Sequence, residues 1–303
     1  MTDCPVPTIR VDVRAPLNLG VTLRPLKRGP ADPTMRLSSR TAIRATRTAD
    51  GPATLSLRFD AGCLAAEAWG PGADAALRGV AALAGLDDDA EAFRPAQPLL
   101  RDLVRTQPGL RLGRSGAVME ALVPAILEQK VTGSEAFSAF RALVLTYGER
   151  APGPFDLWLQ PSPETLARLP YHAFHPLGVE RRRADTIRRA AAHAARLEEV
   201  AAFAPDAARR RLMAIPGIGA WTAAEVTARA LGDPDAVSVG DFHLPNLVAW
   251  ALAGEPRATD ERMLELLEPF MGQRGRVIRL LESSGIRAPR YGPRMAPRSI
   301  ARI

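Results

Sequence analysis

The sequence predicts a mainly α-helical protein that begins with a smaller α+β domain containing an antiparallel sheet. Strand-like patterns are confined to roughly the first 90 residues. From about residue 95, apolar residues recur at helical spacing, and Pro and Gly separate the segments. A length of 303 residues favours two domains. We therefore expect an α+β domain over residues 1–92, a helical domain over 93–286 and a mobile basic tail over 287–303.

Composition places the chain among ordinary globular proteins, with 47% hydrophobic and 24% charged residues. No run of about 18 apolar residues is present, so we expect no membrane span. The opening MTDCPVPTIR does not follow the pattern of a signal peptide. Cys4 and Cys63 are the only cysteines, too few for a disulfide framework. A cytoplasmic location follows from these features.

The charge balance points to a polyanionic partner, since the net charge is +7 and the pI about 10.3. Almost every cation is Arg, because Lys occurs only at Lys27 and Lys130. Codon usage can also produce an Arg-rich protein, so charge alone identifies no partner. The C-terminal segment has five arginines and no acid: Arg287, Arg290, Arg294, Arg298 and Arg302.

The N-terminal elements are predicted from alternating or β-branched stretches. A turn at Asp50-Gly51-Pro52 predicts a hairpin between two of the strands. Residues 72–86 have an amphipathic helical pattern, and Leu17-Asn18-Leu19 fits either a helix start or a loop. The predicted strands cover residues 9–13, 37–46, 53–59 and 63–69.

Helices follow one another through the rest of the chain. Ser162 and Pro163 form a good helix start, and Asp260 suits the first turn of a late helix. The predicted helices cover residues 98–106, 116–130, 134–147, 163–169, 180–197, 205–214, 220–231, 243–253, 259–269 and 273–284.

One stretch, residues 212–244, carries most of the functional information. The turn Pro216-Gly217-Ile218-Gly219 joins two predicted helices. Pro ends the first helix and Gly leaves the backbone accessible. The first N–H groups of the second helix lack partners inside the helix, so they can bind a phosphate. A tight turn between two core helices is the alternative interpretation.

Asp241 follows Gly219 by 22 residues and precedes a predicted helix near His243. An Asp at such a position is commonly an N-cap. It can also be a catalytic carboxylate, whose anionic form the helix dipole favours. His243 is expected to be a residue of the helix start.

The stretch as a whole resembles the helix-hairpin-helix (HhH-GPD) DNA glycosylase superfamily, which has a PGIG-type hairpin followed by a helix and an Asp. Trp221, directly after Gly219-Ala220, is similar to the 3-methyladenine DNA glycosylase II branch. The resemblance implies a helical helix-hairpin-helix glycosylase body behind a small antiparallel-sheet domain. It further implies a bacterial-type, nucleoid-associated enzyme of base excision repair that acts on double-stranded DNA containing damaged bases.

The same resemblance assigns roles to particular residues. Asp241 becomes the carboxylate that stabilises positive charge on the sugar and activates water. The turn of residues 121–132 corresponds to the family's DNA wedge, here Gln129 and Lys130, although a Lys at a helix end is often only solvated. Expected contacts to the DNA backbone come from Pro216, Gly217, Ile218, Gly219, Ala220, Thr222 and Arg274.

Trp221 and Glu225 are four residues apart and share one helical face. An indole face attracts and stacks on a cationic base, and the carboxylate would add countercharge. The alternative is that Trp221 lies in the core and Glu225 on the surface. Phe242 and Phe270 are further candidates for the base pocket. The scattered four His and two Cys predict no metal site, and no cofactor is expected.

Two other functions stay open at this stage. A bifunctional glycosylase with lyase activity needs a Lys nucleophile on the second helix of the hairpin, where this chain has Trp221. A non-catalytic DNA-binding module would have no use for Asp241. We expect a monomeric, monofunctional glycosylase for alkylated, 3-methyladenine-type bases.

Overall fold

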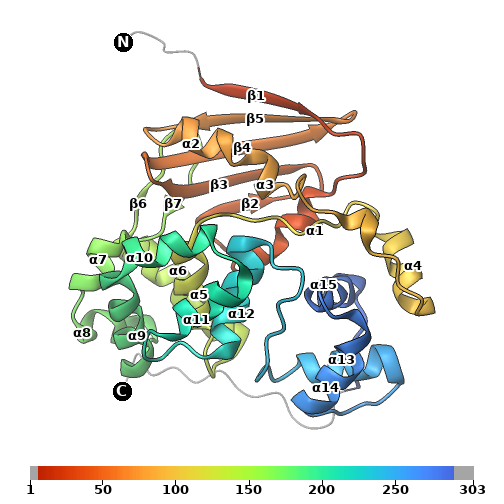
Figure 1. Ribbon diagram of the computed structural model, residues 1–303. Helices are drawn as coiled ribbons and strands as arrows, with labels where there is room; N and C mark the ends of the chain where they lie inside the picture. The colour runs from red at the N-terminus through yellow and green to blue at the C-terminus, as the bar shows by residue number, and fades with distance from the viewer. Residues whose placement is uncertain (1–5, 290–303) are drawn as a thin grey trace.

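The computed structural model describes residues 6–289 and consists of a sheet domain next to a larger set of helices (Figure 1). The expected mainly α fold with an N-terminal antiparallel sheet is confirmed. The five strands pair in the order β1-β5-β4-β3-β2, every pair antiparallel. They are β1 (Thr8–Asp12), β2 (Met35–Leu37), β3 (Thr41–Thr48), β4 (Gly51–Asp60) and β5 (Cys63–Trp69).

Helices cover one face of this sheet, and a core of Leu, Ala, Val and Met side chains fills the space between them. Asn18 caps the first helix by accepting a hydrogen bond from the Val21 N–H, so the Leu17–Leu19 stretch is a helix start. The helix expected over 72–86 is divided at Gly79. These covering helices are α1 (Leu19–Leu23), α2 (Ala73–Arg78) and α3 (Val80–Leu83), and Figure 1 shows α2 and α3 lying across the strands.

Helix α5 (Val118–Leu127) is the centre of the helical body, and every one of its residues except Glu120 is buried. Both of its ends are capped from elsewhere in the chain. The Glu198 carboxylate accepts from the N–H groups of Val118 and Met119, each at 2.9 Å, and Arg183 donates to the Leu127 carbonyl at 2.8 Å. These bonds fix the direction in which α5 delivers the following turn, Gln129-Lys130.

The remaining helices form two groups. Around α5 lie α6 (Gly133–Tyr147), α7 (Pro163–Arg168), α8 (Tyr171–Phe174), α9 (Arg181–Ala192), α10 (Ala194–Glu198), α11 (Pro205–Met213) and α12 (Ala220–Val226), which continues into the π-helical turn η5 (Thr227–Leu231). A second group with its own apolar core comprises α4 (Pro98–Thr106), α13 (Leu244–Ala253), α14 (Asp260–Leu267) and α15 (Arg274–Ser284). The short 3-10 helix η6 (Glu268–Phe270) lies between α14 and α15. Figure 1 shows the chain crossing from one group to the other between α12 and α13.

Further expectations about the elements were wrong. The single strand expected over 37–46 is divided between β2 and β3. Strands do occur after residue 95, as the short antiparallel pair β6 (Glu149–Arg150) and β7 (Trp158–Leu159). A strand of two residues is too short to show alternation in the sequence. The helix expected over 180–197 is interrupted at His193, which separates α9 from α10. The basic tail lies almost wholly beyond residue 289, outside the described residues.

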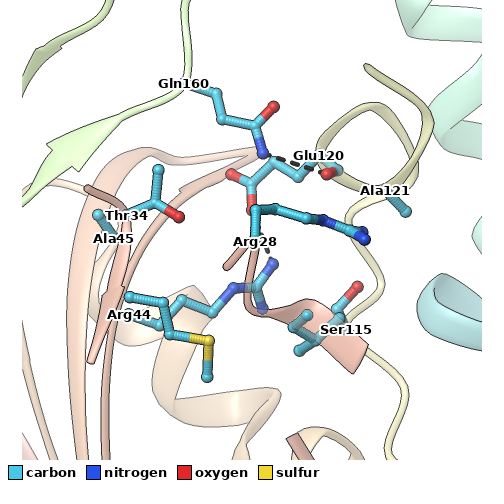
Figure 2. A pocket seen from close by; sticks show the side chains of 10 residues that line it. Arg28, Thr34, Arg44, Ala45, Ser115, Glu120, Ala121 and Gln160 are labelled. Atoms are coloured by element: carbon cyan, nitrogen blue, oxygen red, sulfur yellow. Dashed lines mark hydrogen bonds and ion pairs between the residues drawn. The ribbon is translucent and has the colours of Figure 1, made fainter. Parts of the chain in front are cut away.

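The sheet and the helical body are joined through Glu120 of α5 (Figure 2). Its carboxylate forms an ion pair of 2.7 Å with Arg44, accepts from the Arg47 N–H at 2.6 Å and also accepts from the Thr46 hydroxyl. The Gln160 amide donates to the Glu120 carbonyl. Only about 20 Å³ of free volume remains in the cavity beside this cluster.

Candidate functional site

The hairpin between α11 and α12 combines an exposed backbone with a buried anchor. Ile218 is 6% exposed and belongs to the core around α5, whereas Pro216, Gly217, Gly219 and Ala220 are all exposed. No side chain caps the start of α12, where Gly219 is the N-cap residue. The hairpin therefore presents backbone N–H groups and almost no side-chain bulk to its surroundings.

Helix α9 supports the hairpin from behind. Gly217 has φ +101°, and a Cβ there would lie 2.2 Å from the Thr186 hydroxyl oxygen, so only glycine fits. The exposed Arg189 of the same helix donates to the Pro216 carbonyl. Thr222, also expected to contact the DNA backbone, is buried.

The turn after α5 contacts the hairpin directly. The Gln129 side-chain amide donates to the Gly217 carbonyl at 3.0 Å and to the Thr222 hydroxyl at 2.9 Å. This engagement differs from the expected wedge role for Gln129, because the amide is already bound within the protein. Lys130 is exposed and has φ +55°, a conformation that costs a side chain free energy. Of the two wedge candidates, Lys130 is the one that projects outward.

Asp241 lies at the start of α13, and its carboxylate is held by three N–H donors. Oδ1 accepts from the backbone N–H groups of His243 and Leu244, at 2.8 and 2.9 Å. Oδ2 accepts from the Trp221 indole Nε1 at 3.1 Å. Asp241 thus both caps the start of α13 and binds Trp221, the second residue of α12. A carboxylate oriented in this way is partly exposed and next to an accessible backbone.

The turn that carries Asp241 is well defined. The Asp241 N–H donates to the Ser238 carbonyl at 3.2 Å, and Gly240 between them has φ +92°. This is the pattern of a type II turn, which requires glycine at its third position. The Gly240 N–H donates to Asp260 at the start of α14.

Glu225 differs from the free countercharge expected from the sequence. One carboxylate oxygen forms an ion pair with Arg229, and the other accepts from the Ser238 hydroxyl. Burial raises the pKa of Glu225, but the Arg229 charge and the Ser238 hydroxyl more than offset this, so the pKa lies below its ordinary value of 4.5. The charge that was expected to face a bound base is therefore compensated inside the protein.

Arg229 continues this cluster toward the N-terminal domain. Its Nε donates to the Pro25 carbonyl at 3.0 Å. Nearby, the buried Arg28 forms a 3.0 Å ion pair with Glu128 at the end of α5. Burial and the neighbouring Arg229 charge lower the pKa of Arg28. Glu225, Arg229, Arg28 and Glu128 thus form a buried cluster of two ion pairs between α12, the N-terminal domain and the end of α5.

The other predicted site residues are distributed differently. Phe242 is 84% exposed and stacks edge-on against His243, beside Asp241. Phe270 instead packs with Phe93 in the C-terminal helical group and lines a groove of about 620 Å³ there.

Arg274, expected to contact the DNA backbone, is bound to Asp235 through Nε at 2.8 Å and through its backbone N–H. The hydrogen bonds to that carboxylate raise the pKa of Arg274. The same Asp235 accepts from the Gly272 N–H. Arg274 thus secures the turn before α15, a role different from the expected one.

Several contacts at the site had no signal of their own in the sequence. Arg183, the last residue of an arginine triplet that looks solvated, is buried and caps α5. Ser238 and Arg229 meet Glu225 only in the folded chain. Within residues 6–289, no three His, Cys, Asp or Glu side chains gather closely enough to hold a metal ion. The same residues contain no helix long and apolar enough to cross a membrane.

Comparisons with known proteins find similarity to proteins that are named as DNA repair enzymes. Over 170 residues the chain is 36% identical to AlkA of Mycobacterium tuberculosis, named as a probable bifunctional transcriptional activator/DNA repair enzyme; the match covers 54% of this chain and 34% of that protein. Over 162 residues it is 30% identical to a Bacillus subtilis protein named "Putative DNA-3-methyladenine glycosylase YfjP", and the match covers 51% of this chain and 55% of that protein. The chain thus spans a third to about half of the length of these relatives.

The fold is similar to that of the 3-methyladenine DNA glycosylase from Archaeoglobus fulgidus. The TM-score is 0.78 at 20% identity, with 90% of this chain and 96% of the other covered. At that identity the likeness concerns the fold. Residues 123–271 match the family model described as "HhH-GPD superfamily base excision DNA repair protein", a range that contains the hairpin, Trp221 and Asp241. The resemblance to the HhH-GPD superfamily of base excision DNA repair proteins is therefore confirmed for residues 123–271.

Proposed function

We propose that this protein is a monofunctional DNA glycosylase that hydrolyses the N-glycosidic bond of alkylated, 3-methyladenine-type bases in double-stranded DNA. One observation carries the proposal. The Asp241 carboxylate is oriented by the Trp221 indole and by two backbone N–H groups, next to the exposed hairpin. The superfamily match of residues 123–271 and the name of the Bacillus subtilis relative support the same activity.

The chemistry assigned to Asp241 follows from the reaction. As the bond between base and sugar breaks, positive charge develops on the sugar ring. A fixed carboxylate lowers the energy of that charge and can orient or deprotonate the attacking water. Oδ1 is occupied by two backbone donors, so Oδ2, which accepts only the indole bond from Trp221, is the oxygen that we assign to the sugar or the water. An N-alkylated purine is already cationic and leaves without a strong acid.

The hairpin is proposed to hold a DNA phosphate. Gly217, Gly219 and the start of α12 form an exposed, uncapped surface, and the positive end of the helix dipole favours an anion there. Exposed arginines on α9 and α11, the two helices next to the hairpin, add attraction for the DNA backbone: Arg181, Arg182, Arg210 and Arg211. Such binding weakens steeply as salt concentration rises.

An enzyme acting on a base in a duplex must flip it out of the stack. We assign the space that the base leaves to Lys130, whose exposed side chain stands on the turn bound to the hairpin. Trp221 is the proposed stacking partner of the flipped base, with Phe242 beside Asp241 as a second aromatic candidate. The exposed Phe242 ring lies one residue from the carboxylate in the chain, which supports this assignment.

A lyase activity is not part of the proposal. It requires an amine that forms an imine with the sugar, and Lys27 and Lys130 are the only lysines in the sequence. The position on the hairpin's second helix that a lyase uses for Lys carries Trp221, whose indole is bound to Asp241. The expected product is therefore an unbroken strand with an abasic site.

The proposal is tested by incubating the protein with methylated duplex DNA and separating released bases by chromatography. We expect release of 3-methyladenine or 7-methylguanine well above that of hypoxanthine, because the cationic bases have a weakened glycosidic bond. Strand breaks should appear only after alkali treatment. Binding of the duplex without base release would favour the non-catalytic alternative. A covalent adduct trapped by borohydride, and lost in Lys130→Ala, would favour a lyase.

A further inference from the structure

The turn of residues 238–241 is bound to helices on both of its sides. Toward the C-terminal helices, the Gly240 N–H donates to Asp260, and Asp241 Oδ1 accepts from the backbone N–H groups of His243 and Leu244 at the start of α13. Toward α12, the Ser238 hydroxyl donates to Glu225 and Asp241 Oδ2 accepts from Trp221. Among the described residues, these last two are the side-chain bonds that join the turn to α12.

This division matters because the two sides carry different parts of the site. The Asp241 carboxylate is built on the start of α13, in the C-terminal helical group. The hairpin proposed to hold DNA belongs to the group around α5. The distance between the carboxylate and a bound sugar therefore depends on how the Asp241 turn is positioned against α12.

We propose that Glu225 and Ser238 are positioning residues for the glycosylase reaction: their hydrogen bond fixes the Asp241 turn to α12, so that the carboxylate meets the sugar of DNA held by the hairpin. We call the Glu225–Ser238 hydrogen bond the turn latch. The inference rests on the proposed function, in which Asp241 is the catalytic carboxylate, and adds residues that do not touch the substrate.

The charge cluster behind Glu225 gives the turn latch a rigid base. The Glu225 carboxylate cannot rotate freely, because its other oxygen is paired with Arg229. Arg229 is in turn held by its bonds to the Pro25 and Glu225 carbonyls. A buried and paired acceptor has one preferred geometry, and the Ser238 hydroxyl must meet it there. Arg229 thereby links the placement of Asp241 to the N-terminal domain.

Ser238→Ala is the sharpest variant, because it removes the turn latch and leaves the Glu225–Arg229 pair in place. A small misplacement of a catalytic group can cost up to about 100-fold in rate. We expect single-turnover base release from methylated duplex DNA to fall about 10- to 100-fold, with the DNA dissociation constant unchanged within about two-fold. Ser238→Thr keeps a hydroxyl and should restore most of the rate.

Ser283→Ala is the matched control. Its hydroxyl is also half-buried, but it bonds to Gln107 and to carbonyls within α15, away from the turn. This variant should excise bases at the parent rate. Equal losses of rate in Ser238→Ala and Ser283→Ala, or no recovery in Ser238→Thr, would show a general effect of losing a hydroxyl and would overturn the proposal.

A second readout does not depend on activity. The four tryptophans give four indole N–H signals in a ¹⁵N-labelled sample, and Trp221→Phe identifies the one from Trp221. Because that N–H donates to Asp241, its chemical shift reports the position of the turn. The signal should move in Ser238→Ala and keep its parent position in Ser238→Thr and Ser283→Ala. An unmoved signal in Ser238→Ala would overturn the turn latch.

Asp241→Asn, measured in parallel, separates the two proposals. If Asp241→Asn is inactive while Ser238→Ala excises at the parent rate, the turn latch is wrong and the proposed function stands. If Asp241→Asn excises at nearly the parent rate, Asp241 is not the catalytic carboxylate, and the turn latch loses its purpose together with that assignment. Loss of rate in both variants is the expected result. The indole signal should shift in Ser238→Ala although Asp241 itself is unchanged, whereas Asp241→Asn alters the acceptor of that N–H directly.

Discussion

At the scale of single residues, the two glycines of the hairpin differ in the space around them: Gly217 is crowded and Gly219 is open. A Cβ on Gly217 would collide with Thr186, and the backbone there has φ +101°, which other residues rarely adopt. A Cβ on Gly219 would meet nothing within 4 Å. Gly219 also has φ −104°, which any residue can adopt. The fold thus requires glycine at position 217. It does not require glycine at position 219, where the absence of a side chain leaves the backbone accessible to a ligand.

We predict that Gly219→Ala keeps the stability of the parent but weakens duplex DNA binding by about five-fold, equivalent to roughly 1 kcal/mol for one impaired hydrogen bond. Gly217→Ala should instead lower the free energy of unfolding by at least about 1–2 kcal/mol. Thermal unfolding and fluorescence anisotropy with undamaged duplex measure both effects. Normal DNA binding by Gly219→Ala would mean that the hairpin has only a structural role.

The sequence predicted some residue-level features because they are local. Asp241 could be placed at a helix start from the residues around it, and its cap geometry agrees. The four-residue spacing of Trp221 and Glu225 correctly predicted a shared face, since both reach the turn of residues 238–241. The partner of Glu225 could not be predicted, because Arg229 and Ser238 compete with any ligand only once the chain is folded.

At the scale of elements, α12 and its π-helical turn depend on the Glu225–Arg229 pair. The pKa of Glu225 lies below 4.5 in the folded protein, as the Arg229 charge and Ser238 hydroxyl outweigh burial. A depressed carboxyl pKa contributes stability above the unfolded-state pKa, and that contribution is lost as pH falls through the folded-state pKa.

We therefore predict that Glu225→Gln is less stable than the parent by about 1–3 kcal/mol at pH 7, because Arg229 loses its counterion. The difference should shrink as pH falls from 4.5 through the lower folded-state pKa, because the parent carboxyl becomes protonated over that range. Urea unfolding across pH measures this. Glu91→Gln, at an exposed position, is the control and should stay within about 0.5 kcal/mol at every pH. A difference independent of pH would contradict the ion-pair explanation.

Element boundaries could be predicted where capping residues mark them. Ser162 caps α7 by accepting from the Thr165 N–H, as its sequence context indicated. The break between α9 and α10 at His193 could not be predicted, because neither Gly nor Pro marks it. The short strands β6 and β7 form through pairing and through contact with the sheet, as the Trp158 N–H donates to the Pro33 carbonyl.

At the scale of the whole molecule, the sheet domain and the helical body are held together by buried polar contacts. Glu120 and Arg44 have side chains only 11% and 10% exposed, and Glu120 also serves Thr46 and Arg47. Both general architectures followed from the different periodicities of the two parts of the sequence. The contacts that join the two parts could not be predicted, because nothing in the sequence indicates that Glu120 in a helix pairs with Arg44 in a strand.

We predict that Glu120→Ala lowers the free energy of unfolding by about 3–5 kcal/mol, because Arg44 is left buried without its counterion. Glu282→Ala, which removes a more exposed partner of Arg279, should cost less than about 1 kcal/mol. Chemical denaturation followed by circular dichroism and by tryptophan fluorescence measures the loss. Similar stabilities of the two variants would show that Glu120 does not join the domains energetically.

The central claim is that Asp241 stabilises the charge that develops as the base leaves, and Asp241→Asn tests it most directly. Asn keeps the shape of the side chain but removes its charge. Single-turnover release of 3-methyladenine from methylated duplex should fall about 100- to 1,000-fold, while the DNA dissociation constant stays within a few-fold of the parent. Release within a few-fold of the parent rate would contradict the assignment of Asp241 as the catalytic carboxylate.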